Sequence, residues 1–193
     1  MALTFDDGPD PEGTPAVLDA LEAIGARATF FMVGEQAEAH AALAREVAER
    51  GHGVGLHGWR HVRPHELDDP QADLRRALSV LEQTTGVAPR TFRPPYGRFT
   101  TALYEAATEL DLEPVLWSAW GLDWEPLPAK RIADLVLTDL QPGSIVVLHD
   151  SARYAPRASA EPTADALGEI AAGAARLGIE LQPLQPEVRR TSV

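Results

Sequence analysis

Short apolar runs alternate with longer segments of helical period along most of the chain. The apolar runs predict buried strands, and the segments with apolar residues three or four apart predict amphipathic helices. The predicted strands cover 1–5, 28–33, 54–57, 91–93, 114–117, 144–148 and 178–181. The predicted helices cover 14–24, 36–50, 70–85, 100–110, 130–139 and 160–177. This alternation predicts about seven βα units around a parallel sheet.

The residues that follow the strands favour a barrel over an open sheet. Nearly every predicted strand ends in polar residues, as in barrels that carry an active site at the carboxyl ends of their strands. No strand is followed by the glycine-rich phosphate loop of nucleotide-binding open sheets. Because there is no internal repeat and no linker, residues 1–193 are predicted to form a single α/β domain, with a polar tail over 183–193.

Composition removes several classes of protein. A hydrophobic fraction of 45% and a charged fraction of 24% are typical of a globular domain. The net charge of -12 argues against binding to a nucleic-acid backbone. The chain has no cysteine, so disulfides and thiolate metal sites are excluded. No run approaches the roughly 20 apolar residues of a membrane span, and no signal segment precedes the first strand.

Two adjacent carboxylates, Asp6 and Asp7, follow the first apolar run, and Gly8 and Pro9 break the strand directly after them. Successive strand residues point to opposite sides, so one aspartate is able to hold a metal while the other handles a proton. An Asp-Asp-Gly-Pro sequence is also a common turn without any function. The choice between these interpretations depends on the other polar clusters of the chain.

A pair of histidines, His57 and His61, lies just past another strand end. Histidines four residues apart meet on one side of a helical turn, which brings two imidazoles to one cation, and one carboxylate would complete such a site. Surface histidines at this spacing also arise by chance. His65 is expected at the surface or in a groove.

Three further clusters also follow strands. Two prolines and a glycine fix the loop after Arg93, so this arginine is presented rigidly and the Tyr96 amide is able to point into a site. Asp123 and Trp124 follow the fifth predicted strand, and His149 ends the strongly apolar sixth. A rigid proline turn and a buried core histidine are the alternative interpretations. Together, however, five clusters fall where barrels of this type keep their active sites.

In order and spacing, these clusters resemble the five motifs of the polysaccharide deacetylase (NodB homology) family, carbohydrate esterase family 4. The matching segments are Thr-Phe-Asp-Asp-Gly-Pro at 4–9, His57-x-x-x-His61, Arg-Pro-Pro-Tyr at 93–96, Asp123-Trp124 and Leu148-His149. The similarity continues through 28–31 and 51–55 and extends to about residue 181. It implies an irregular (β/α)7 barrel that removes N- or O-acetyl groups from chitin, chitooligosaccharides, peptidoglycan or xylan with one divalent metal.

The resemblance also implies a role for each residue around the metal. Asp7, His57 and His61 resemble the metal ligands, for zinc in the first place and cobalt or nickel as alternatives. Asp6 resembles the general base that takes a proton from the attacking water, and Arg93 the arginine that orients this base.

The other half of the site is likewise implied by the resemblance. His149 resembles the general acid that protonates the leaving nitrogen, and Asp123 the carboxylate that supports its cationic form. The Tyr96 amide would help the metal to stabilise the oxyanion, next to Pro95 in the same loop. Leu148 and Trp124 are similar to the apolar wall around the acetyl methyl group.

The chain departs from the family pattern at two places. Gly58 stands where the family usually has Ser or Thr, so we expect a hydrogen bond near the metal to be missing and metal affinity to be lower. The segment 117–122 before Asp123 is more apolar than expected. Trp59 and Trp120 are therefore candidates for a sugar-stacking wall, although tryptophans are as often part of the core.

These observations predict a metal-dependent hydrolase that removes acetyl groups from N-acetylated sugars. A hydrolase of small amides or imides and an acetylxylan esterase are the enzymatic alternatives, and a non-catalytic carbohydrate-binding relative is a further one. We expect a polysaccharide or oligosaccharide substrate and a monomer. We also expect a secreted or cell-envelope location with the signal or anchor removed, a cytoplasmic location being the alternative.

Overall fold

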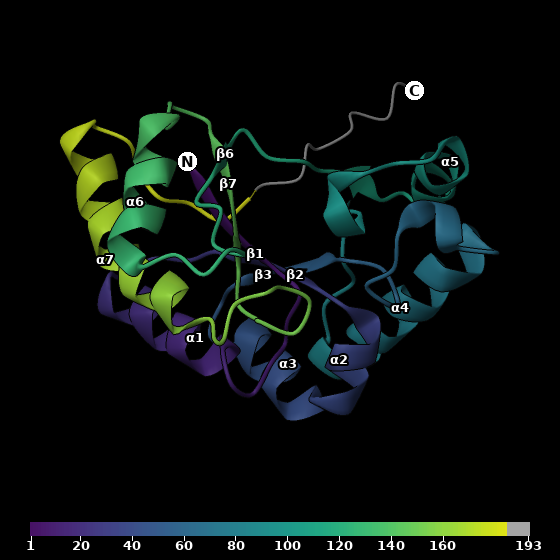
Figure 1. Cartoon of the computed structure of the whole chain (residues 1–193). Helices are drawn as coiled ribbons and strands as arrows, with labels where there is room; N and C mark the ends of the chain where they lie inside the picture. The colour runs from purple at the N-terminus through teal and green to yellow at the C-terminus, as the bar shows by residue number, and fades with distance from the viewer. Residues whose placement is uncertain (185–193) are drawn as a thin grey trace, which may run out of the picture.

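The structure, a computed structural model, describes residues 1–184 as an α/β fold in which helices surround one sheet of parallel strands (Figure 1). The strand order is β5-β4-β3-β2-β1-β7-β6. The strands are β1 (Ala2–Asp6), β2 (Thr29–Met32), β3 (Gly53–Leu56), β4 (Thr91–Phe92), β5 (Glu113–Pro114), β6 (Ala119–Trp120) and β7 (Ile145–His149). The sheet curls but does not close, because β5 and β6 form its two edges. This half-barrel confirms the predicted fold class.

The helices follow the predicted ranges closely. They are α1 (Thr14–Ala23), α2 (Gly34–Ala39), α3 (Ala41–Glu49), α4 (Pro70–Thr85), α5 (Thr101–Glu109), α6 (Ala129–Thr138) and α7 (Glu161–Arg176). Helix α4 has the predicted bounds because Asp69 caps its first turn and Gly86, at φ 72°, ends it in the left-handed conformation. The single helix predicted over 36–50 is instead α2 and α3, which are separated at His40, where ψ is 47°.

Two strand predictions need correction. The segment 178–181 does not form a strand, and Gln182 makes only an isolated parallel bridge to Ala2. The seventh strand is β6, which pairs with β7 through Ala119 and Trp120. Ala119 and Trp120 lie between Ser118 and Gly121, so they form no apolar run of the four or more residues that indicates a strand.

The hydrophobic core lies between the sheet and the helices that cover its outer face. In β1, Leu3 and Phe5 point into this core, and Phe5 stacks on Phe30 of β2 with ring centroids 5.1 Å apart. Successive strand residues alternate sides, so Thr4 and Asp6 point to the inner face. The curled inner face is where polar side chains gather.

Within residues 1–184, no helix has the length and apolar character needed to cross a membrane. Most of the predicted polar tail over 183–193 lies outside the described residues.

Candidate active site

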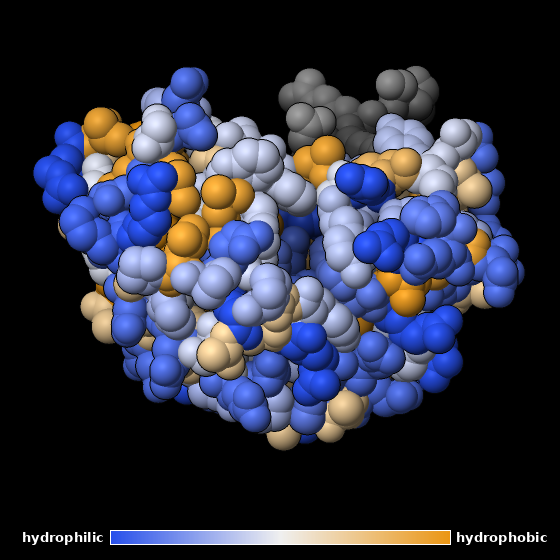
Figure 2. Space-filling view, viewed as in Figure 1, coloured by the Kyte–Doolittle hydropathy of each residue, from blue (hydrophilic) through white to orange (hydrophobic). Residues whose placement is uncertain are grey.

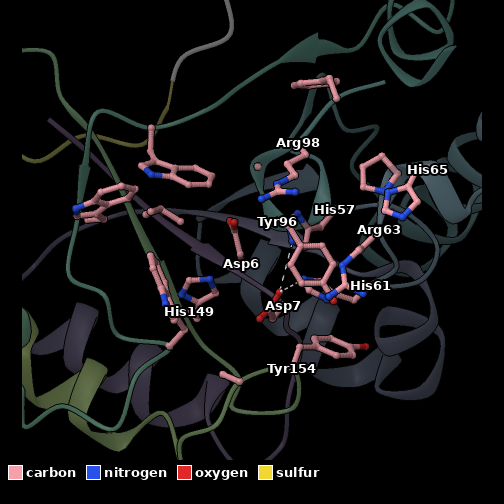
Figure 3. A pocket seen from close by; sticks show the side chains of 18 of the residues that line it. Asp6, Asp7, His57, His61, Arg63, His65, Tyr96, Arg98, His149 and Tyr154 are labelled. Carbon is pink, nitrogen blue, oxygen red and sulfur yellow. Dashed lines mark ion pairs between the residues drawn. The ribbon is translucent and has the colours of Figure 1, made fainter. Parts of the chain in front are cut away.

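A cavity of about 650 Å³ opens at the carboxyl ends of the strands. Figure 2 shows a hollow near the middle of this face of the molecule, and Figure 3 shows side chains that line it. Asp6, Asp7, His57, His61 and His149 all contribute to the lining. The structure therefore brings together polar clusters that are up to 143 residues apart in the chain (149 minus 6).

Asp6, the last residue of β1, is held by a buried arginine. Arg93 donates from Nη1 to Asp6 Oδ1 at 2.7 Å and to Thr4 Oγ1 at 2.7 Å, and it is fully buried. Its guanidinium lies over the ring of Phe31, 4.2 Å from the centroid. A buried charge is stable only when it is paired, so Asp6 and Arg93 fix each other's position and leave the second carboxylate oxygen for other contacts.

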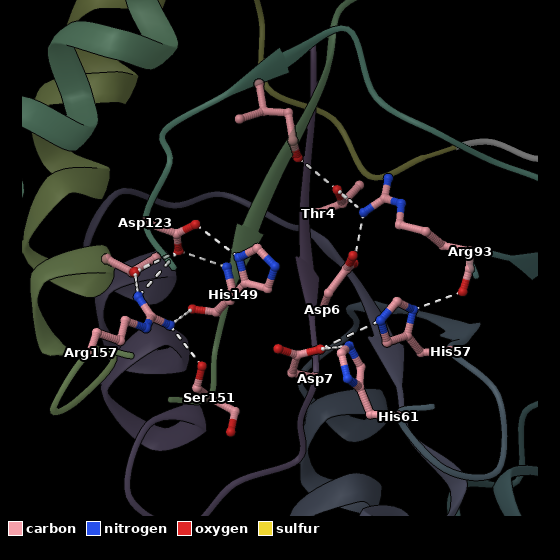
Figure 4. Close-up of polar contacts among 12 residues, drawn as sticks. Thr4, Asp6, Asp7, His57, His61, Arg93, Asp123, His149, Ser151 and Arg157 are labelled. Atoms are coloured by element: carbon pink, nitrogen blue, oxygen red, sulfur yellow. Dashed lines mark hydrogen bonds and ion pairs between the residues drawn. The ribbon is translucent and has the colours of Figure 1, made fainter. Parts of the chain in front are cut away.

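Asp7 points away from Asp6 and toward two histidines (Figure 4). Its Oδ1 atom lies 3.4 Å from His57 Nε2 and 3.2 Å from His61 Nε2. Asp7 has a left-handed backbone, with φ 84°, which aspartate tolerates better than most residues. Burial raises the pKa of the Asp7 carboxyl, but contact with His57 and the nearby imidazoles outweigh it and lower the pKa to about 2.

This group of side chains fits a divalent metal. The possible ligand atoms of Asp7, His57 and His61 all lie within 4.8 Å of one another, and the buried Asp7 Oδ1 has no hydrogen-bond donor. His57 Nδ1 lies 2.7 Å from the carbonyl oxygen of Arg93, which accepts its proton and leaves the Nε2 lone pair free. Burial lowers the pKa of His61 to about 4, so its imidazole is neutral and able to bind a cation. One carboxylate and two imidazoles suit zinc and its neighbours in the first transition series.

His61 is held in an unusual way. Its Nδ1 atom is buried without a hydrogen-bond partner. The ring instead stacks on Tyr154, with centroids 4.3 Å apart and planes at 12°, and on its other side contacts Tyr96 at 4.6 Å. Tyr154 is itself tied to α2, since its hydroxyl donates to Glu35 Oε1 at 3.2 Å and accepts from Gln36 Nε2 at 3.1 Å.

Asp123 and His149 form a second polar group on the other side of the cavity (Figure 4). His149 Nδ1 lies 2.8 Å from Asp123 Oδ1, and its backbone amide donates to Oδ2 at 2.8 Å. Burial lowers the pKa of His149, but the carboxylate of Asp123 outweighs burial and raises the pKa to about 9. The imidazolium form is therefore favoured, with its Nε2 proton on the side away from Asp123.

Asp6 and His149 lie side by side on neighbouring strands. They are register partners in the parallel pair of β1 and β7. Neighbouring strands lie roughly 5 Å apart, so the two side chains flank one small space beside Asp7. The loop that turns Asp7 toward the histidines depends on Gly8, because a Cβ there would collide with the carboxylate of Asp150, which accepts from the Gly8 amide at 3.0 Å.

The apolar wall of the cavity differs from expectation at three residues. Trp59 does not line it, because the ring is buried against Gly34 with Arg76 stacked on it at 3.6 Å. Pro95 is also buried outside the lining. Leu148 is fully buried in the core, since His149 points inward and its neighbour must point outward. Val147, two residues before His149, lines the cavity instead.

The remaining wall is aromatic. Trp117, Trp120 and Trp124 line the cavity, and their rings follow one another at 6.4 and 6.1 Å, ending on His149 at 5.6 Å. Trp120 is 43% exposed, so part of this aromatic wall is accessible from solvent.

Several residues of the site carried no signal in the sequence. Arg157 is buried, donates to Asp123 Oδ2 at 3.3 Å, and also binds the carbonyl oxygens of His149 and Ser151 at 2.8 Å. Tyr154 lies in the same loop. A single arginine or tyrosine in a polar loop forms no pattern, and only long-range packing shows its contacts.

Comparison with known proteins decides the family. A family model described as "Polysaccharide deacetylase" matches residues 1–115. The chain belongs to this family. It is 35% identical over 172 residues to a peptidoglycan-N-acetylglucosamine deacetylase of Bacillus cereus, covering 88% of this chain and 61% of that protein. It is 32% identical over 191 residues to a chitooligosaccharide deacetylase of Azorhizobium caulinodans, covering 94% of this chain and 91% of that protein.

A solved structure of another relative shows the same fold. It is a family 4 acetyl xylan esterase from Clostridium thermocellum in complex with a cobalt ion, with a TM-score of 0.84 and 31% identity over 94% of this chain and 86% of that one. The resemblance inferred from the five motifs is therefore confirmed. The chain spans less than two thirds of the Bacillus cereus relative, at 61% of its length.

Proposed function

We propose that this polysaccharide deacetylase is a metal-dependent hydrolase that removes the acetyl group from N-acetylated sugars. The observation that carries the proposal is the placement of Asp6 and His149 as partners on neighbouring strands, in the cavity that Asp7, His57 and His61 also line. A base, an acid and a cation site in one cavity are the parts that amide hydrolysis requires.

Asp7, His57 and His61 would hold one divalent cation, for which zinc is our first proposal and cobalt or nickel the alternatives. Such a cation is a Lewis acid, which polarises a carbonyl oxygen and lowers the pKa of a bound water to near neutrality. The hydrogen bond of His57 to Arg93 and the stacking of His61 on Tyr154 keep both imidazoles oriented for this task.

Asp6 would accept the proton of the water that attacks the acetamide carbonyl carbon. Arg93 holds one oxygen of Asp6, so the other would accept this proton. The Tyr96 amide, presented by a left-handed residue with φ 60°, would donate to the oxyanion that forms. His149 Nε2 would then protonate the nitrogen as the carbon–nitrogen bond breaks, which releases acetate and an amino sugar.

The walls of the cavity support a sugar substrate. Sugar rings pack on aromatic faces, and the exposed ring of Trp120 is available beside Trp124. Val147 takes the place proposed for Leu148 next to the acetyl methyl group. Tyr96 and Trp120 are 48% and 43% exposed at the rim, so the site is open, which favours a polymer over a small amide or imide. We further propose a monomer that acts at the cell envelope.

The test is acetate release from chitooligosaccharides, peptidoglycan and acetylxylan with defined metals. Release from the N-acetylated substrates, lost after chelation and restored by zinc or cobalt, is the expected result. Activity on acetylxylan alone would favour the esterase alternative, which the Clostridium thermocellum relative represents. Full activity after verified removal of the metal would refute the mechanism.

A further inference from the structure

The rim of the cavity carries positive charge in a protein whose net charge is -12. Arg63, His65 and Arg98 line the cavity, whereas the acidic residues of its lining are the deeply buried Asp6 and Asp7. Figure 3 shows Arg63, His65, Tyr96 and Arg98 together on the side of the cavity away from His149. With 29 acidic against 17 basic residues, a rim chosen at random would be acidic.

Arg98 is presented by a rigid loop. It follows Gly97, whose backbone packs so closely on Trp117 that a Cβ at this position would overlap the indole. The next residue, Phe99, packs edge-on against Phe92 of β4 at 6.0 Å. The backbone of Arg98 is therefore fixed on both sides, and its side chain is exposed at the opening. Among residues 1–184, no carboxylate forms an ion pair with Arg98.

Arg63 lies on the other side of Tyr96. Its guanidinium is 5.4 Å from the centre of the Tyr96 ring, and its side chain is 58% exposed. The contact of Nη1 with Glu66 Oε1 is 3.6 Å long and exposed, so it holds Arg63 only weakly. Tyr96 thus has an exposed guanidinium on each side at the rim, and neither is neutralised by a strong partner.

We propose that Arg63 and Arg98 form a subsite for a carboxylate on the sugar next to the one that is deacetylated. A neutral glycan would not need two cations at the opening, and the overall negative charge would repel an anionic glycan unless a local positive rim received it. A guanidinium binds carboxylates through paired N–H donors. This inference rests on the proposed function and assigns the enzyme to acid-bearing glycans, such as those with a lactyl ether, over chitin-like ones.

The test compares two oligosaccharides that differ only in charge. One alternates N-acetylglucosamine with N-acetylmuramic acid, and the other is the same compound with its carboxylates methyl-esterified. We expect kcat/KM for acetate release to be about tenfold higher for the free acid, since a hydrogen bond to a charged group is worth about that factor. Arg98→Gln and Arg63→Gln should each lower kcat/KM on the free acid more than on the ester and so reduce this preference. High salt should reduce the preference as well.

Arg75→Gln is the matched control, because it removes the same charge from the exposed face of α4 and should keep the preference. Arg98→Lys, which retains the charge, should keep part of the preference for the free acid. Equal kcat/KM on acid and ester in the unchanged protein would overturn the subsite and leave the deacetylase proposal standing, as would equal losses on both compounds in the Arg98 variant.

Binding separates failure of the subsite from failure of the proposed function. If neither these compounds nor chitooligosaccharides release acetate, the deacetylase proposal fails, and calorimetry with the same two compounds still tests the subsite. Tighter binding of the acid, lost in Arg98→Gln, would support the subsite, and equal binding would refute it.

Discussion

Replacing Asp123 by asparagine should move the alkaline limb of the pH–rate profile to lower pH. Asp123 Oδ2 accepts from the His149 amide, Arg157 and Thr163, so the asparagine oxygen should take this position. The new NH2 group then replaces Oδ1 and faces His149 Nδ1. Two donors cannot face each other, so the imidazole must lose its Nδ1 proton, and the cationic form becomes unfavourable.

The size of the shift follows from the pKa of His149. Asp123 is the main group that holds this pKa at about 9, against burial, which lowers it. Without the carboxylate we expect the pKa to fall to the free-imidazole value of about 6.5 or lower. At pH 8 the protonated fraction then falls from about nine tenths to about 3%, so activity should drop about 30-fold at this pH and much less at pH 6.

The assay is acetate release from a chitooligosaccharide between pH 5 and 10, with metal content measured in parallel. The acid limb and the metal content should stay in place.

The same pKa shift affects stability. His149 is stabilised as a cation in the folded state, so its contribution is complete below pH 6.5 and is lost as the pH rises through about 9.

Denaturant unfolding provides the second measurement. The unfolding free energy of the original protein should fall by about 3 kcal/mol more than that of the variant over this window. An unchanged alkaline limb in Asp123→Asn, with metal and fold intact, would show that His149 is not the group that must be protonated.

Six further substitutions test other parts of the site. Asp6→Asn should keep the metal and lose most turnover, whereas His57→Ala should lower metal affinity, as measured by calorimetry with zinc. Tyr154→Ala should weaken metal binding by about tenfold because His61 loses its stacking partner, and Tyr154→Phe, which keeps the ring, should not. Leu148→Ala should reduce the unfolding free energy by about 2–5 kcal/mol with little change in KM. Val147→Ala, at a position that is also buried but lines the cavity, should raise KM as well as reduce the unfolding free energy.

The parts of the site that the sequence predicts are those that depend on local geometry. Asp6 and Asp7 lie at the end of a strand, where alternation sends them to different partners, and the structure places them against Arg93 and the two histidines. Each polar cluster lies at the end of its strand or within a few residues of it, so the parallel order of the sheet is enough to bring the clusters to one edge.

The parts that could not be predicted depend on contacts distant in sequence. Tyr154 stacks on His61 from a loop 93 residues away (154 minus 61), and Arg157 reaches Asp123 from the same loop. The position of Trp59 also depends on packing, since the left-handed Gly58, at φ 85°, turns the chain before the indole enters the core. No periodicity in the sequence encodes such contacts.

The assignment of Leu148 shows that the same rule of alternation must be applied to both strands at once. Asp6 and His149 are register partners, so Phe5 and Leu148 share the outer face while Thr4 and Val147 share the inner one. Thr4 donates to the carbonyl oxygen of Val146 at 2.6 Å, which ties β1 to β7 next to the cavity. Because Leu148 immediately precedes an inward histidine in a regular strand, its side chain cannot reach the substrate without a bulge, and β7 pairs with β1 without interruption.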